Sequence, residues 1–204
     1  MKLTWLGHAC FLLEIGGLRV ILDPCKGVPG GADTAGEADA VYCRPGHFDH
    51  CYTELLTVRE KNASPFTVRE IESFHDDKNG TLRGSNTIRA LTAEGITVVH
   101  LGDLGHTLSG EQLANIGKCD VLLLPIGGTY TLDIAQAKAV ADAVAPRVVI
   151  PMHYRRGEMG FEVLQTVEEF AAQYDGQSVH FLSDNTVELS EECLTRGGVV
   201  TLGI

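Results

Sequence analysis

The segment CRPGHFDHC, residues 43–51, concentrates metal-ligating side chains in one short stretch. His47, Asp49 and His50 fall within four positions, and imidazole and carboxylate groups suit zinc, manganese or iron. Alternate side chains in such a loop can face different points, so one metal could take His47 and a second could take Asp49 and His50. By itself this spacing is a moderately specific indication of a metal site.

Further candidate ligands follow predicted strands elsewhere in the chain. His75 ends EIESF, Asp103 follows TVVHL, and His153 follows RVVIP. Loops at strand ends are where a rigid sheet can aim side chains at a shared point, so we expect these groups to meet the 43–51 segment. This combination favours a divalent metal site over a set of unrelated histidines.

Short apolar and β-branched runs predict strands through much of the chain. They cover residues 3–6, 10–15, 18–22, 39–43, 66–74, 86–91, 95–101, 120–125, 147–151, 178–182 and 186–189. Gly16 and Gly17 form the two-residue turn of a predicted hairpin.

Helices are predicted mainly in the later half. Ser109 and Gln112 match a capping box, so a short helix begins there. Apolar residues recur at helical spacing through 132–145 and 161–174, and residues 52–61 are also predicted to be helical. A strand-rich early half followed by alternating strands and helices favours an α/β sandwich with helices outside packed sheets.

The composition bounds the class of protein. The chain has 204 residues, 44% hydrophobic and 21% charged, which fits one globular domain over residues 1–204. A net charge of −11 argues against a broad nucleic-acid-binding face. Six scattered cysteines without CxxC pairs, and no signal-peptide or membrane-span pattern, predict a cytoplasmic protein with reduced thiols.

Several segments occur in an informative order: WLGHACFLLE, ILDP, GHFDH, FHDDKNGTLRGSNT, VVHLGDLGH, LLLPIGGTYTLD and VIPMHY. Together they resemble the metallo-β-lactamase fold superfamily, in the branch of small bacterial metal-dependent hydrolases similar to ascorbate-6-phosphate lactonase. The resemblance extends to about residue 190. It implies an αββα sandwich of two mixed β-sheets flanked by helices, with a two-metal site at one edge of the sheets.

The resemblance also implies roles for individual residues. The implied ligands are His47 and His75 for the first metal, and Asp49, His50 and His153 for the second. Asp103 would bridge the two metals, and Asp103 and Asp49 are the catalytic candidates. Asp23 would be a structural carboxylate supporting the site loop, and His8 would lie near the metal pocket.

One position departs from the family pattern. The loop usually reads His-x-His-x-Asp-His, and Pro45 stands at the first histidine position, so the first metal loses a ligand. The second site could hold a single metal, the first could survive with water as a ligand, or Cys43 could supply a substitute thiolate. Arg44 could also fill the space of the missing metal with its guanidinium. We favour a single metal, bound through Asp49, His50, His153 and Asp103.

Other polar residues lie near the predicted ligands. His100 and His106 flank Asp103, and each could hold a ligand in place or serve only local packing. Arg155 and Arg156 follow His153, so they could contact a phosphate or carboxylate on the substrate, or form an ordinary solvated loop.

These inferences predict a metal-dependent hydrolase that uses a metal-bound hydroxide on an ester, lactone or phosphoester of a small anionic metabolite. The cofactor would be Zn²⁺ or Mn²⁺, with one per chain favoured and two still open. The alternative is a catalytically inactive metal- or ligand-binding protein of the same fold. A nuclease is less favoured because of the acidic charge balance, and neither nucleic acid nor membrane is expected as a partner. Relatives of this kind often assemble, so the resemblance also leaves a homo-oligomer open.

Overall fold

The computed structural model of the chain describes residues 1–43, 50–59, 64 and 66–203. The residues discussed above that lie outside this described part are Arg44, Pro45, His47 and Asp49. Their predicted roles therefore stay predictions.

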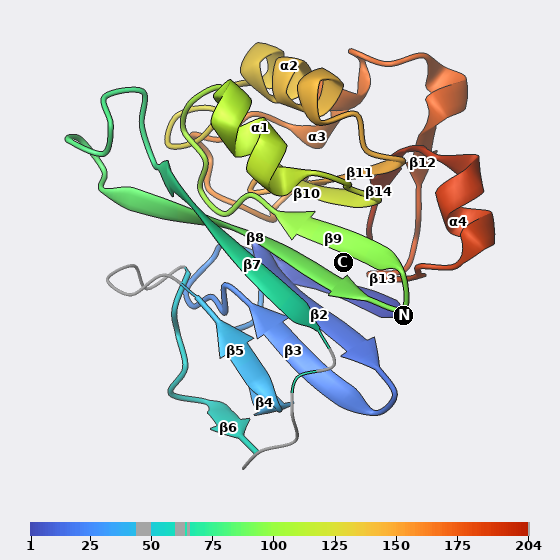
Figure 1. Cartoon of the computed structure of the whole chain (residues 1–204). Coiled ribbons are helices and arrows are strands. Elements are labelled where there is room, and N and C mark those ends of the chain that lie inside the picture. The colour runs from blue at the N-terminus through green and yellow to red at the C-terminus, as the bar shows by residue number, and fades with distance from the viewer. Residues whose placement is uncertain (44–49, 60–63, 65, 204) are drawn as a thin grey trace.

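Two mixed β-sheets pack face to face (Figure 1). The five-stranded sheet has the order β13-β1-β2-β3-β5, with strands Thr186–Glu188, Lys2–Gly7, Cys10–Ile15, Leu18–Leu22 and Ala40–Tyr42. The seven-stranded sheet has the order β12-β14-β11-β10-β9-β8-β7, with strands Val179–Phe181, Gly198–Thr201, Val148–Met152, Val121–Pro125, Ile96–His100, Ser85–Ala93 and Thr67–Phe74. A small parallel pair joins β4 and β6, which are Gly36–Ala38 and Leu56–Val58.

Helices cover the outer face of the seven-stranded sheet (Figure 1). The α-helices are α1 (Gly110–Ile116), α2 (Ile134–Val144), α3 (Val167–Ala171) and α4 (Glu191–Arg196), and a 3₁₀ turn spans Gly176–Ser178. Helix α1 contacts β7, α2 contacts β10, and α3 packs against α2. The predicted α/β sandwich of two mixed sheets is therefore observed, with helices packed on the seven-stranded sheet.

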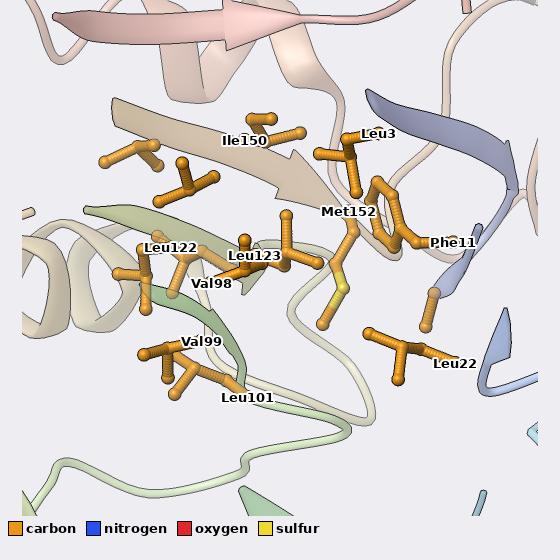
Figure 2. Close-up of a cluster of buried hydrophobic side chains, with 14 of the residues drawn as sticks. Leu3, Phe11, Leu22, Val98, Val99, Leu101, Leu122, Leu123, Ile150 and Met152 are labelled. Atoms are coloured by element: carbon orange, nitrogen blue, oxygen red, sulfur yellow. The ribbon is translucent and has the colours of Figure 1, made fainter. Parts of the chain in front are cut away.

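The hydrophobic core fills the space between the sheets. Figure 2 shows side chains from both sheets meeting there, among them Leu3, Phe11, Leu22, Leu123, Ile150 and Met152. Strands β10 and β11 are buried at every position, because the opposite sheet covers one face and helices cover the other. This rigid double layer carries the loops that hold the candidate ligands.

Several local predictions are confirmed. Gly16 and Gly17 link β2 to β3, which pair in antiparallel register. The side chain of Ser109 accepts a hydrogen bond from Gln112 N, which completes the capping box at the start of α1. The helix predicted over 132–145 is α2.

Two helix predictions need correction. The helix predicted over 161–174 is shorter, because Thr166 caps α3 and the helix begins only at Val167. The helix predicted over 52–61 is wrong at its centre, where Leu56–Val58 form strand β6. Pairing with β4 and the β-branched Thr57 and Val58 outweigh the helical pattern there.

The expectation of reduced thiols is wrong for one pair of cysteines. Cys43 and Cys51 form a disulfide, with their Cα atoms 5.1 Å apart. The two ends of the 43–51 segment meet in space, which spacing along the chain does not reveal. Cys43 is therefore not a free thiolate in this structure. No helix within the described residues combines the length and apolar character needed to cross a membrane.

Candidate metal centre

Three buried histidines gather at one edge of the sandwich. His8 lies in the turn between β1 and β2, His50 lies at the end of the 43–51 segment, and His153 follows β11. One ring nitrogen from each lies within 4.8 Å of the others, and each residue is at most 2% exposed. Segments far apart in sequence thus supply one compact cluster of imidazoles.

Asp103 connects this cluster to His75. Its Oδ2 atom lies 2.9 Å from His50 Nε2 and 3.1 Å from His75 Nε2. Its Oδ1 atom lies 3.6 Å from His153 Nε2. The structure therefore brings together the four predicted ligands that it describes.

Unusual backbone conformations aim several of these side chains. His8, Asp23 and His153 have φ values of 53°, 43° and 53°, in the left-handed region that few residues other than glycine adopt. Each residue follows a strand, so the change of backbone direction turns its side chain out of the alternating pattern of the sheet. Such conformations cost about 1–3 kcal/mol each and cluster at functional sites.

Asp23 supports His50 from behind. Asp23 Oδ2 lies 3.2 Å from His50 Nδ1, while the other ring nitrogen of His50 faces Asp103. A carboxylate on the far nitrogen fixes the ring and its tautomer, as is common for metal-ligating histidines. Asp23 thus contacts the far nitrogen of His50, and its role as a supporting carboxylate stays a prediction.

Arg89, which sequence reasoning missed, joins this network from β8. The buried guanidinium lies 3.7 Å from Asp23 Oδ1 and donates hydrogen bonds to Cys43 O at 3.1 Å and Glu70 Oε1 at 2.9 Å. Arg89 therefore ties the start of the 43–51 segment to the carboxylate that holds His50. The sequence does contain an indication of this role. Arg89 is a charged residue inside the predicted strand TIRAL, and arginine is seldom buried without a partner.

Asn86 holds the loop that carries Asp103. Its Oδ1 atom accepts a hydrogen bond from Asp103 N at 3.0 Å, and its Nδ2 atom donates to Ser73 Oγ and Leu101 O, both at 2.8 Å. Gly102 has a φ of 58°, and a Cβ atom there would overlap Asn86 Oδ1. Close packing of this loop thus fixes the Asp103 backbone.

His100 and His106 use their ring nitrogens to bind the protein. His100 is fully buried, its Nε2 atom donates to Ala9 O at 2.9 Å, and Gly102 N donates to its Nδ1 atom at 3.0 Å. Phe74 N donates to His106 Nε2 at 3.2 Å, and His106 Nδ1 donates to Thr107 O at 2.8 Å. These histidines therefore hold the residues next to His8, Asp103 and His75 in the chain, which are Ala9, Gly102 and Phe74.

Burial and close charges set the protonation of the centre. Burial alone would raise the pKa of Asp103, but contacts with His50, His75 and His153 hold it well below its usual range. Burial lowers the pKa of His50, yet Asp103 and Asp23 outweigh that effect and raise it. Burial and nearby His8 lower the pKa of His153 well below its ordinary value. An ionised carboxylate beside a neutral imidazole is the form that binds a cation.

Arg155 lines a pocket next to the centre. A pocket of about 480 Å³ beside it is lined by Pro29, Arg155, Gly157, Glu158, Gly160, Phe161 and Glu162. The Phe161 ring meets the His8 ring edge-on, with 5.7 Å between centroids. This pocket therefore adjoins the histidine cluster.

Comparison with known proteins identifies the family. Residues 2–153 match the model of the β-lactamase superfamily domain. The chain belongs to this superfamily. The predicted metallo-β-lactamase fold is thereby confirmed.

Relatives within the superfamily carry related names. The UPF0173 metal-dependent hydrolase of Archaeoglobus fulgidus is 32% identical, and the match covers 76% of this chain and 83% of that protein. A counterpart from Carboxydothermus hydrogenoformans is 30% identical over 76% of this chain and 84% of its own. Both are similar to this chain and are named for a metal-dependent hydrolytic activity.

Solved structures agree with this assignment. A crystal structure from Thermotoga maritima, described as a proposed Zn-dependent hydrolase of the metallo-β-lactamase superfamily, has a TM-score of 0.74 and 34% identity. The match covers 100% of this chain and 99% of the Thermotoga maritima chain. The metallo hydrolase Igni18 of Ignicoccus hospitalis, with a TM-score of 0.64 and 20% identity over 99% of this chain and 94% of its own, shares the fold.

Proposed function

We propose that the chain is a metal-dependent hydrolase acting on an ester, lactone or phosphoester of a small anionic metabolite. The observation that carries this proposal is the convergence of His50, His75 and His153 on Asp103. The names of the relatives support the reaction class. The ester, lactone or phosphoester preference extends the likeness to ascorbate-6-phosphate lactonase.

The donors fit a divalent cation. Imidazole nitrogen and carboxylate oxygen are the ligands of zinc and also suit manganese. Among the described residues, Asp23 and Asp103 place two buried carboxylates against His50, and a carboxylate beside imidazoles suits a cation. His50, His153 and Asp103 would hold the ion, Asp49 stays a further predicted ligand, and His75 contacts the Asp103 carboxylate. When bound, the cation would polarise a substrate oxygen and lower the pKa of water toward neutrality.

The surrounding residues would prepare the reaction. Asp103 is positioned by Asn86 at the centre of the histidines, where its carboxylate can orient a water molecule and accept its proton. Phe161 lies against His8 and limits access of bulk water on that side. Half-buried Arg155, in the adjoining pocket, would bind the negative group of the substrate.

We also propose a single metal per chain. Pro45 removes one donor from the usual first site, and the described ligands cluster around one carboxylate. Atomic absorption or plasma mass spectrometry on protein loaded with zinc or manganese measures this number. About one ion per chain supports the proposal, whereas two ions would show that the first site is complete.

Turnover before and after chelation tests the hydrolase. Metal-free protein, then protein reloaded with zinc or manganese, is assayed on an aryl ester, a lactone, a phosphomonoester and a phosphodiester. We expect loss of activity on chelation, recovery on reloading, and loss in Asp103→Asn. The matched control is His180→Ala, which removes a half-buried histidine of β12 outside the centre. Metal binding without turnover would favour the inactive binding protein instead.

Localisation and assembly remain predictions. The cytoplasmic prediction must accommodate the Cys43–Cys51 disulfide, a bond more typical of oxidising surroundings. Counting free thiols in freshly isolated, denatured protein tests whether this pair is reduced in the cell. Sedimentation measures whether the chain forms a homo-oligomer.

A further inference from the structure

We infer that His8 is a metal ligand of this chain and that it completes a three-imidazole site with His50 and His153. This inference rests on the metal-binding part of the proposed function and not on the hydrolytic step. It assigns a ligand from the β1–β2 turn, whereas the family resemblance places His8 only near the pocket. The other candidate ligands lie in loops that follow β5, β7, β9 and β11.

The spacing of the three nitrogens is the first support. The chosen ring nitrogens of His8, His50 and His153 all lie within 4.8 Å of one another. Imidazole donors on tetrahedral zinc are about 3.4 Å apart, given Zn–N bonds of about 2.0–2.1 Å. Small side-chain rotations therefore suffice to bring all three nitrogens onto one ion.

The rigid attachment of His8 is the second support. Its carbonyl oxygen accepts hydrogen bonds from Trp5 Nε1 at 3.0 Å and from His153 N at 3.1 Å. The next carbonyl, that of Ala9, is bound by His100. The His8 and His153 rings stand 4.0 Å apart between centroids. The backbone thus presents the two imidazoles as a fixed pair.

The backbone strain at His8 is the third support. A φ of 53° lies in the left-handed region, which histidine and asparagine adopt more often than most residues but at a higher cost than glycine. His153 carries the same φ of 53°. Two strained histidines joined by one backbone hydrogen bond are explained if both side chains serve the same ion.

The composition of the site is the fourth support. Pro45 offers no donor where the family usually has a histidine. His8 supplies a third imidazole beside His50 and His153, from the end of another strand. Three protein imidazoles with room for a further ligand are a known arrangement of catalytic zinc. Asp103 would lie beside that ion, because its Oδ2 atom is 2.9 Å from His50 Nε2 and its Oδ1 atom is 3.6 Å from His153 Nε2.

The test replaces His8 by asparagine, which tolerates the left-handed conformation but is a poor zinc ligand. Zinc affinity is measured by competition with a chromophoric chelator, and circular dichroism checks the fold. We expect His8→Asn to weaken zinc binding by more than about 100-fold, because even loss of an outer partner of a ligand costs about 10–100-fold. The control His180→Ala should bind zinc like the unaltered chain.

A second variant gives a positive signal. In His8→Cys loaded with cobalt(II), a ligating thiolate would produce a sulfur-to-cobalt charge-transfer band in the near ultraviolet that the unaltered chain lacks. The band supports the inference even if His8→Asn folds poorly. Two results would overturn the inference. One is a folded His8→Asn chain whose zinc affinity lies within about threefold of the unaltered chain. The other is a folded His8→Cys chain that shows no charge-transfer band. Failure of the unaltered chain to bind metal would instead overturn the proposed function and, with it, this inference.

Discussion

Replacing Gly102 by alanine tests whether the close packing behind Asp103 determines the metal centre. Gly102 has a φ of 58°, and its Cβ position overlaps Asn86 Oδ1 and lies 3.3 Å from Thr87 O. Asn86 Oδ1 is also the acceptor for Asp103 N. The added methyl group must therefore displace either the Asn86 side chain or the loop that carries Asp103.

The magnitude follows from two contributions. Alanine in the left-handed region costs about 1–2 kcal/mol. Leaving the buried Asp103 N–H without its acceptor costs about 1–3 kcal/mol more. The free energy of unfolding of Gly102→Ala should thus fall by roughly 2–5 kcal/mol. At about 2–4 °C per kcal/mol for a chain of this size, Tm falls by roughly 4–20 °C.

Urea unfolding gives the free energy, and zinc competition gives the accompanying change at the metal centre. Because Asp103 shifts, we expect zinc affinity to fall by about 10–100-fold. The matched control is Gly110→Ala at the exposed first residue of α1, where no atom lies within 4 Å of the added Cβ. Alanine favours helices, so this control should be neutral or slightly stabilising.

A double-mutant cycle makes the prediction sharper. If the cost arises through Asn86, then adding Gly102→Ala to Asn86→Ala should cost less than adding it to the unaltered chain. The interaction energy should exceed about 0.5 kcal/mol, as expected for contacting residues. Additive effects, or a Gly102→Ala chain as stable as the Gly110→Ala control, would refute the reasoning.

Further predictions concern the buried network, a helix cap and the ion itself. Arg89→Met should lower the free energy of unfolding by about 3 kcal/mol or more, because it leaves the Asp23 carboxylate buried without its cation. The control Lys138→Met removes a half-buried lysine whose partner Asp142 is exposed, so it should cost less than about 1 kcal/mol; equal losses would contradict this. Hydrogen bonds from Thr166 lower the pKa of exposed Glu169, so its contribution is present above about pH 4.3 and is lost as the pH falls through the lower folded value. Glu169→Gln should therefore remove less than about 1 kcal/mol of stability at pH 7 and still less at pH 2, and an equal effect at both values would count against the cap. Zinc at about 100 times its Kd should stabilise the unaltered chain by about 2.7 kcal/mol in thermal unfolding, and an unchanged Tm would mean that no folded-state site exists.

Much of the fold could be predicted because local patterns decide it. The Gly16–Gly17 turn, the capping box at Ser109 and the buried run of β11 each depend on residues close in sequence. The positions of His75 and His153 at strand ends follow from the same patterns. These interactions act over a few residues, so a short stretch of sequence is enough to predict each turn, cap or strand.

Other features could not be predicted because they depend on distant partners. Leu56–Val58 form a strand only because β4 offers them a partner. Cys43 and Cys51 form a disulfide because the ends of their segment meet. In each case a contact made by folding outweighs the local preference.

The sequence by itself determined the superfamily, the sandwich of mixed sheets and the types of side chain available to bind a metal. Only the tertiary structure decided that His8 joins His50 and His153, and that Arg89 connects Asp23 to the start of the 43–51 segment. The physical reason is that ligand geometry depends on where separate strands end in space. That placement is set by the packing of the two sheets, which no single segment encodes.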